Sequence, residues 1–199
     1  TSGSTHDSKR GEDVRARIGV LSQLAPEWVD AVHNLREATA HERGNLNGRT
    51  ENLLWQTLAG TWTLDGPLEA DRFTGYLIKA SREAKDWTSW TAQDGDAEAE
   101  LIAFAEHVLT SPAVAEIMTA WVTRTASPVR TATLATKALQ LTLPGVADVY
   151  QGTETTAVAL VDPDNRRPVD HEPLAETLQR LDEGTKPVGL GEEKLRLTA

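Results

Sequence analysis

The sequence predicts a mainly α-helical fold, on three observations. Apolar residues recur at three- and four-residue spacing in at least six segments, which is the spacing of one helix face. Only two short, apolar, β-branched runs are typical of strands. Pairs of Pro and Gly, or of Asp and Gly, separate several of these segments. At 199 residues, 39% of them hydrophobic, the chain is long enough to bury a core in one domain or two small ones.

The first helices are predicted from apolar stripes and from residue types that favour a helix start. Pro26 suits the first turn of a helix, and Thr50 is a residue type that caps one. The pair Gly66-Pro67 indicates a turn. In chain order, we expect helices at 14–21, 26–35, 50–58 and 69–86, with a loop at 42–49.

The later elements follow the same logic. Pro112 and Pro128 each stand where a helix could start, with Ser127 as the cap of the second. The β-branched runs Val146–Tyr150 and Ala157–Val161 are the strand candidates. The remaining expected helices are 96–109 after the break at Asp94-Gly95, 128–143 before Pro144-Gly145, and 171–182 before Gly184.

Composition excludes several classes of protein. The chain has no Cys, so it has no disulfide framework and no thiolate ligands, which fits a cytoplasmic protein. A formal charge of −10 argues against nucleic-acid binding, which needs clustered Lys and Arg. No apolar run approaches membrane-spanning length, so we expect no membrane partner. The five His are scattered, and we expect no metal site and no cofactor.

A polar cluster at 4–15 combines a His-Asp pair, two adjacent cations and two further carboxylates before a helix. Carboxylate acceptors beside cationic donors can bind a hydroxyl-rich ligand. The alternative is a helix N-terminus whose acidic residues face the positive end of the helix dipole. Taken alone, the residue types favour this second interpretation.

Two further clusters follow in the last third of the chain. Residues 144–154 form a turn, a short strand and a polar end, the place where active-site loops lie in parallel α/β folds. A buried strand ending in a turn explains the same residues equally well. Residues 160–170 pair Arg166 and Arg167 with Asp residues between two Pro, which predicts a rigid loop tied by ion pairs.

Six of the ten aromatic residues are Trp. Trp87 and Trp90 follow a run of charged residues at 79–85, and an indole beside hydrogen-bonding groups can stack on the apolar face of a sugar. Core packing is the commoner use of Trp and is the alternative.

These clusters, in this order, resemble the C-terminal half of the maltooligosyltrehalose synthase family, within the α-amylase superfamily. The matching stretches are STHDSKRGEDVRARI at 4–18, ENLLWQTLAGTW at 51–62, KASREAK at 79–85 with TSW at 88–90, PGVADVYQGTE at 144–154 and LVDPDNRRPVD at 160–170. Together they span most of the chain. The resemblance therefore favours the ligand-binding interpretation of the first cluster.

The resemblance implies a fold: a helical insertion subdomain plus the last strands of a (β/α)8 TIM barrel. By this comparison, residues 1–13 end barrel strand 7 and carry the catalytic loop, and 14–143 hold the insertion and a barrel helix. Residues 144–183 form barrel strand 8 with its loop and helix, and 184–199 lead toward a C-terminal β domain. A strand-to-strand repeat of such a barrel is only ~30 residues, so the long helical stretch needs an insertion. The chain, which starts without Met, is then expected to be one part of a longer polypeptide, whose remaining barrel half is its partner.

The resemblance also implies an activity, that of a (1→4)-α-D-glucan 1-α-D-glucosylmutase of trehalose biosynthesis. This isomerase, an intramolecular transferase, converts the reducing-end α-1,4 linkage of a maltooligosaccharide into an α,α-1,1 trehalose linkage. Asp7 matches the superfamily's third acidic residue, the transition-state stabiliser, and is the one catalytic residue expected here. The implied substrate-binding residues are His6, Lys9, Arg10, Lys79, Arg82, Lys85, Tyr150, Gln151 and Glu154.

The chain departs from the family pattern at several points. The family's nucleophile and general acid lie on earlier strands, so this chain alone is expected to be inactive. Asp86-Trp87 stands where the family usually has an apolar residue and His, and residues 155–158 replace a usual Leu-Trp-Asp-Leu. The alternative function is a stand-alone helical module that binds a carbohydrate or a protein without catalysis.

Overall fold

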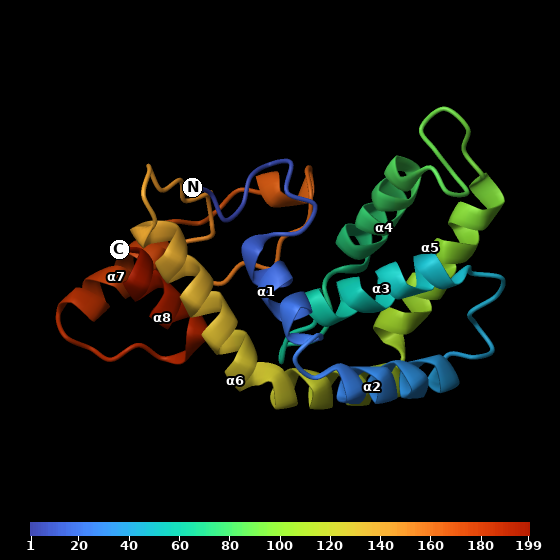
Figure 1. Ribbon diagram of the computed structural model, residues 1–199, viewed down its shortest axis with the longest axis horizontal. Helices are drawn as coiled ribbons and strands as arrows, with labels where there is room; N and C mark the ends of the chain where they lie inside the picture. The colour runs from blue at the N-terminus through green and yellow to red at the C-terminus, as the bar shows by residue number, and fades with distance from the viewer. The chain divides into compact units, whose positions relative to one another are not determined.

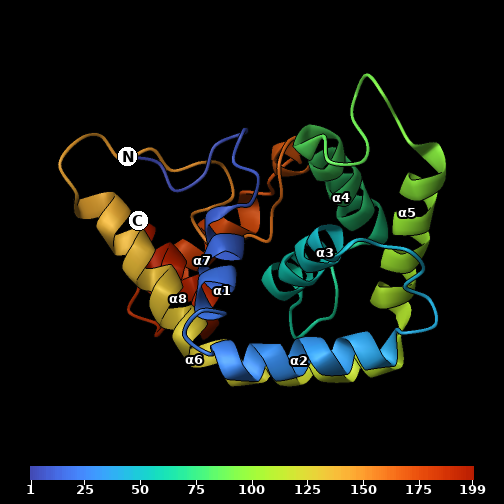
Figure 2. The ribbon, with the colours of Figure 1, turned by 45° about the vertical axis from the view of Figure 1, so that its right-hand side comes forward.

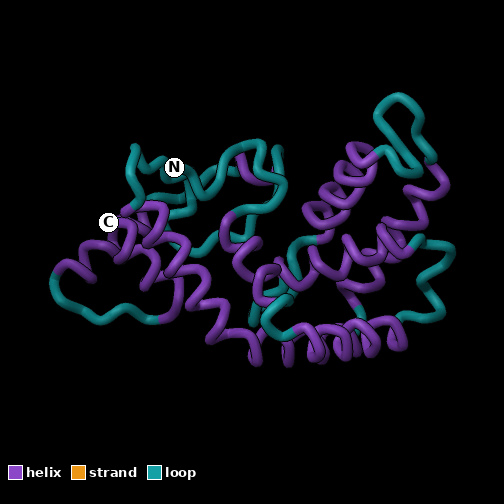
Figure 3. The backbone as a smooth tube through the Cα atoms, in the orientation of Figure 1, coloured by secondary structure: helices purple, strands orange, loops and turns teal.

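The computed structural model describes residues 1–199 and contains eight α-helices and no sheet (Figures 1 and 3). The mainly helical prediction is confirmed. The helices are α1 (Glu12–Val20), α2 (Ala25–Ala38), α3 (Gly48–Thr61), α4 (Ala70–Ala84), α5 (Gly95–Thr110), α6 (Pro112–Thr142), α7 (Glu172–Asp182) and α8 (Gly189–Thr198), with a 3-10 turn, η1, at Asp164–Arg166.

The chain divides into two compact units. Unit 1 consists of residues 1–20 and 125–199, and unit 2 consists of residues 21–124. Unit 2 is therefore continuous in sequence, whereas unit 1 is made from both ends of the chain. No single helix of either unit is long and apolar enough to span a membrane, and α5 with α6 meets that test only as a bent pair.

Unit 2 has an aromatic and leucine-rich core. Helix α4 packs against α5 and also contacts α3 (Figure 1). Trp55 of α3 meets the edge of Phe104 of α5 with ring centroids 5.9 Å apart. Trp55, Trp62 and Trp121 are buried, so core packing explains half of the tryptophans. Burying such side chains removes large apolar areas from water and stabilises the unit.

The cap of α3 differs from the prediction. Thr50 was the expected cap, but the helix begins two residues earlier, at Gly48, and Asn47 is its N-cap. The Asn47 Oδ1 accepts hydrogen bonds from the backbone N–H groups of Arg49 and Thr50, at 3.1 and 2.9 Å. Asn satisfies the free N–H groups of the first turn at least as well as Thr does, so the earlier start prevails.

The helix expected to start at Pro128 is also a wrong prediction. Helix α6 runs without a break from Pro112 to Thr142, with Pro128 inside it, and Ser127 is not a cap. Proline lacks an N–H and crowds the carbonyl of the preceding turn, but it does not end every helix that contains it. The boundary between the two units, at Arg124 and Thr125, lies in the turn before Pro128.

Neither predicted strand forms, so the expected last strands of a barrel are not present as strands. Residues 146–150 make one parallel bridge, between Asp148 and Ser2, and residues 157–161 make one antiparallel bridge, between Leu160 and Arg10. A strand needs a partner along its length, and in this chain each run forms a β-bridge at one residue only. Val146, at the start of the first run, is 85% exposed.

Helices α7 and α8 pack against each other in unit 1 (Figure 2). The predicted helix 171–182 is confirmed as α7, and Gly184, at φ +96°, follows its end in the left-handed region that favours glycine. Helix α8 lies within residues 184–199, where the sequence indicated no helix. Its Leu195 is buried, like Val14 and Leu181 in the same unit.

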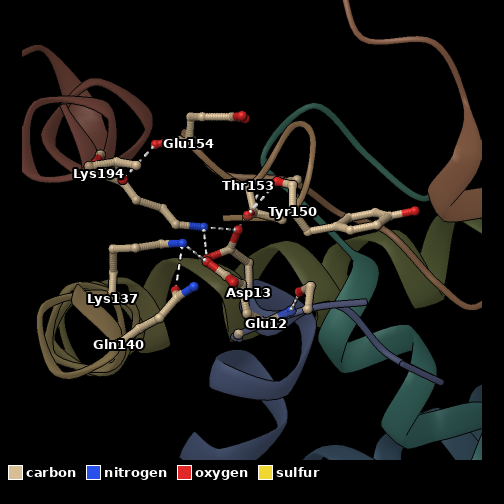
Figure 4. Close-up of polar contacts among 12 residues, drawn as sticks. Glu12, Asp13, Lys137, Gln140, Tyr150, Thr153, Glu154 and Lys194 are labelled. Carbon is tan, nitrogen blue, oxygen red and sulfur yellow. Dashed lines mark hydrogen bonds and ion pairs between the residues drawn. The ribbon is translucent and has the colours of Figure 1, made fainter. Parts of the chain in front are cut away.

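The interior of unit 1 also contains a four-residue ion cluster, formed by Glu12 and Asp13 of α1, Lys137 of α6 and Lys194 of α8 (Figure 4). Both Lys Nζ atoms contact Glu12 Oε1, at 2.7 and 2.8 Å, and Lys194 Nζ lies 2.7 Å from Asp13 Oδ2. All four side chains are at most 5% exposed. Two carboxylates and two ammonium groups balance in charge, which burial in a low-dielectric interior requires.

Backbone groups extend this cluster into the loops. Asp13 Oδ2 accepts a hydrogen bond from the N–H of Ala157 at 2.8 Å. Gln140 accepts from Lys137 Nζ at 2.8 Å and donates to the carbonyl of Asp148 at 2.7 Å. Burial alone raises the pKa of Glu12, but the hydrogen bonds from Lys137 and Lys194 outweigh it and hold the pKa below its ordinary value.

Replacing Lys194 with Met should destabilise unit 1 strongly. The substitution keeps the side-chain volume but removes the Lys194 ammonium from the buried carboxylates of Glu12 and Asp13, and breaking a buried pair in this way costs about 3–5 kcal/mol. The free energy of unfolding from urea denaturation, with hydrogen exchange of the α8 amides, measures the effect. Lys186→Met, at an exposed lysine of the same unit, is the matched control. Equal losses in the two variants would contradict a special role for the cluster.

Candidate functional site

The His6-Asp7 pair lies on a tight turn, Thr5–Ser8, at the surface of unit 1. The N–H of Ser8 donates to the carbonyl of Thr5 at 3.1 Å, and the N–H of Thr5 donates to Ser8 Oγ at 2.9 Å. His6 Nε2 lies 3.1 Å from Asp7 Oδ2, with side-chain exposures of 51% and 82%. The turn therefore exposes a carboxylate and an imidazole side by side at the surface of unit 1.

A second loop, residues 160–166, forms hydrogen bonds with the backbone of this turn. Asn165 Nδ2 donates to the carbonyls of Thr5 and His6 at 3.1 and 3.0 Å, and the N–H of Asp162 lies 3.4 Å from the same His6 carbonyl. The predicted ion pairing within this loop is confirmed, since Arg166 Nε lies 3.0 Å from Asp162 Oδ2. The loop thus contacts a turn about 160 residues away in the sequence.

Backbone contacts fix the segment that leads from the turn to α1. The N–H of Gly11 donates to the carbonyl of Ala159 at 2.8 Å. A Cβ at position 11 would lie 3.0 Å from that carbonyl oxygen, so glycine permits the close approach. Lys9 is exposed and Arg10 is half-buried, and the carbonyl of Arg10 accepts a hydrogen bond from Arg15 at 2.6 Å.

Of the three substrate-binding residues expected in 150–154, only Gln151 is linked by a hydrogen bond to the loop that holds the His6-Asp7 turn. Gln151 Nε2 lies 3.5 Å from the carbonyl of Asn165, which links Gln151 to the loop that holds the His6-Asp7 turn. The carbonyl of Tyr150 accepts from the N–H and hydroxyl of Thr153, while its ring points away from the ion cluster (Figure 4). Glu154 has a buried Oε2 with no hydrogen-bond partner.

The three expected cations of unit 2 lie on or beside α4. Arg82 forms a two-pronged ion pair with Glu98 of α5, Nε to Oε1 at 2.8 Å and Nη2 to Oε2 at 2.6 Å. Its guanidinium also lies 5.0 Å from the ring centre of Trp90. Lys79 is half-buried and Lys85 is exposed at the left-handed C-cap of α4. Arg82 thus has a partner within its own unit.

Glu98 is a strongly held carboxylate. The hydrogen bonds from Arg82 lower the pKa of Glu98 to about 2, against an opposing effect of burial and with help from the Thr88 hydroxyl at 2.6 Å. Together these contacts fasten the segment after α4, which carries Trp87 and Trp90, to α5.

Trp87 lines a small pocket of unit 2. Its Nε1 donates to Thr50 Oγ1 at 3.0 Å, which fixes the orientation of the indole. The pocket has a volume of about 140 Å³ and is also lined by Asn45, Leu46, Asn47, Ala97 and Glu100. Trp90 is 52% exposed. No group of three or more His, Asp or Glu that could hold a metal ion occurs in the structure.

Comparison with known proteins gives a consistent result. Two proteins from strains of Mycobacterium tuberculosis, provisionally named as maltooligosyl trehalose synthases, are 43% identical to this chain over 171 residues, covering 84% of this chain and 22% of theirs. The structure of maltooligosyltrehalose synthase from Arthrobacter ramosus matches with a TM-score of 0.86 and 38% identity, over 100% of this chain and 25% of that one. This chain is homologous to about a quarter of maltooligosyltrehalose synthase.

A further solved structure supports the homology. A protein of Sulfolobus tokodaii, described as a hypothetical maltooligosyl trehalose synthase, matches with a TM-score of 0.75 and 30% identity, over 98% of this chain and 27% of that one. No family model matches the chain. The chain spans about a quarter of the length of the synthases it resembles.

Sequence reasoning missed Asn165 and the ion cluster. Asn165 lies in the matched stretch LVDPDNRRPVD, but the flanking charges indicated only ion pairs. Glu12 and Asp13 have the residue types of a helix start, and the structure does place them in the first turn of α1. The signal that separates these roles is the contact with Lys137 and Lys194, which the local sequence does not contain.

The pairing of Glu98 predicts a pH-dependent stability. Because its folded pKa, about 2, is below the ordinary 4.5, its contribution is present above pH 4.5 and is lost as the pH falls toward 2. Glu98→Gln should lower the free energy of unfolding at neutral pH and flatten its fall between pH 4.5 and 2. Urea denaturation at a series of pH values measures both. Glu106→Gln, at an exposed carboxylate of α5, serves as control, and an identical profile for the two variants would contradict the prediction.

Proposed function

We propose that this chain is part of a (1→4)-α-D-glucan 1-α-D-glucosylmutase. In the proposed reaction, the reducing-end α-1,4 linkage of a maltooligosaccharide becomes an α,α-1,1 trehalose linkage. The observation that carries the proposal is the homology to maltooligosyltrehalose synthase along nearly the whole chain, in sequence and in structure. The exposed carboxylate of Asp7 on a braced turn is the feature of this chain best suited to act on a sugar.

The proposed chemistry is that of a retaining glycosidase. A carboxylate attacks the anomeric carbon, a carboxylic acid protonates the leaving oxygen, and the transition state resembles an oxocarbenium ion. Asp7 would accept hydrogen bonds from sugar hydroxyls and stabilise that transition state, with His6 beside it as a donor. The nucleophile and the acid would come from the rest of the enzyme. The leaving glucose would stay in a closed pocket, reorient and return through its own anomeric hydroxyl, so the exclusion of water decides between isomerisation and hydrolysis.

The parallel bridge between Ser2 and Asp148 supports the expected barrel placement. The N–H of Asp148 donates to the carbonyl of Thr1 at 2.8 Å, and the N-terminal amine of Thr1 donates to the carbonyl of Val146 at 2.7 Å. Neighbouring strands of a (β/α)8 barrel run parallel, as these two segments do. In this proposal, the remaining barrel half of the same polypeptide is the partner, and the enzyme acts in the cytoplasm.

Asp7→Asn in a full-length synthase that contains this chain should lower turnover by orders of magnitude. The substitution keeps the shape of the side chain but removes the negative charge that stabilises the transition state, and losing one such group typically costs about 10²–10³ in kcat. Release of trehalose-terminated product from maltopentaose is the measurement, with circular dichroism to confirm the fold. Near-normal turnover would remove Asp7 from the proposed role.

The second candidate is a carbohydrate-binding module, which the fixed indole of Trp87 and its pocket favour. If the catalytic proposal is correct, this chain alone should bind maltopentaose no more tightly than a Kd of about 1 mM, because most of the site is elsewhere. Titration calorimetry measures the affinity, and Trp87→Ala is the control. Micromolar binding that Trp87→Ala abolishes would instead favour the module.

A further inference from the structure

The side chain of Asn165 ties the His6-Asp7 turn to the rest of unit 1. Its Nδ2 donates to two consecutive carbonyls, those of Thr5 and His6, at 3.1 and 3.0 Å. The other hydrogen bonds of the Thr5–Ser8 turn lie within it, except that the N–H of Asp162 lies 3.4 Å from the His6 carbonyl. The Asn165 amide thus makes the two shortest hydrogen bonds from loop 160–166 to the backbone from which both side chains project.

The oxygen atom of the Asn165 amide is in a less favourable environment than the nitrogen. Asn165 Oδ1 is buried and has no hydrogen-bond partner. A buried acceptor without a partner costs about 1–3 kcal/mol. The Asn165 amide therefore keeps both donations although its own acceptor atom is unpaired.

The loop that carries Asn165 is suited to fix a position. The N–H of Leu160 donates to Asp164 Oδ2 at 2.8 Å, and Arg166 pairs with Asp162 across one turn. Leu160 and Val161 are buried, so the loop is anchored in the interior of unit 1 at its start. These contacts fix the part of the loop that carries Asn165 without a ligand. The hydrogen bonds from Asn165 in turn position the His6-Asp7 turn.

We propose that Asn165 is a positioning residue that aims the His6 and Asp7 side chains at the sugar substrate. The inference rests on the proposed function, since it assigns to Asn165 a part in the transglycosylation that Asp7 serves. Asn165 touches no reacting atom in this scheme. It acts through the backbone of Thr5 and His6, and a displacement of about 1 Å at such a site can cost 10²-fold in rate.

The sharpest test is the isosteric variant Asn165→Asp. It replaces the donor Nδ2 with an oxygen that faces two carbonyl oxygens, so the turn must move away while the loop keeps its shape. In a full-length synthase, kcat should fall about 10- to 100-fold while KM changes little, because ground-state binding is spread over many other contacts. Asn165→Ala, which removes the donors without repulsion, should give a smaller fall.

Nuclear magnetic resonance on this chain provides a readout that does not depend on activity. In Asn165→Asp, the amide signals of Asp7 and Ser8 and the ring signals of His6 should shift, whereas the methyl signals of Val14 and Leu195 should not. Asn34→Asp, at an exposed residue of α2, adds the same charge and should leave both the signals and turnover unchanged.

The outcomes separate cleanly. Unchanged His6 and Asp7 signals, or unchanged turnover in a synthase that Asp7→Asn inactivates, would overturn the positioning role. Shifts that spread to Val14 and Leu195 in both Asn165 variants would also overturn it, because they indicate a role in the fold as a whole. If Asp7→Asn leaves turnover unaffected, the proposed function fails, whatever the signals of the Asn165 variants show.

Discussion

The buried charge balance between Glu12, Asp13, Lys137 and Lys194 is the constraint on which the rest of unit 1 depends. These residues belong to α1, α6 and α8, and each cation contacts a carboxylate at 2.7–2.8 Å in a nearly water-free interior. Ion pairs at the surface contribute little, but a buried carboxylate that loses its cation is strongly destabilising. Arrangements of the three helices that separate these charges are therefore strongly disfavoured.

The candidate site is connected to the ion cluster by a series of contacts that position the His6-Asp7 turn. Asp13 accepts the N–H of Ala157, and three residues further on Leu160 enters the interior beside the segment that ends at Gly11. The loop that follows carries Asn165 to the His6-Asp7 turn. A chain of contacts thus runs from a buried ion cluster, through backbone hydrogen bonds, to an exposed carboxylate. Exposed catalytic groups generally need such support, because solvent alone does not hold a side chain in one orientation.

How far the sequence predicts the structure depends on how local each signal is. The stripes of α4 and α5 are complete within one segment, and both helices were predicted within two residues of their observed bounds. The start of α3 was misplaced because Asn47 and Thr50 are both capping residue types. The strand at 146–150 was predicted from β-branched residues, but a strand also needs a partner. The helices can therefore be predicted from the sequence, whereas the pairing of distant segments cannot.

The same distinction applies to the candidate site. His6 and Asp7 are neighbours in sequence, so their chemistry could be proposed directly, and the matching motifs add a role. Asn165 and Lys194 act on residues about 160 and 180 positions away, and nothing near them in sequence indicates it. The partner of Arg82, a cation expected to contact the substrate, is likewise not indicated by its local sequence, since Glu98 lies on the next helix.

The composition of unit 1 from both ends of the chain has a consequence for synthesis on the ribosome. Unit 2 is continuous, so residues 21–124 can fold as soon as they emerge. Glu12 and Asp13 are made about 180 residues before Lys194, so their charges must stay hydrated until that lysine has emerged. Unit 1 then folds after unit 2, and the segment bearing Asp7 reaches its final form only after α8 has been made.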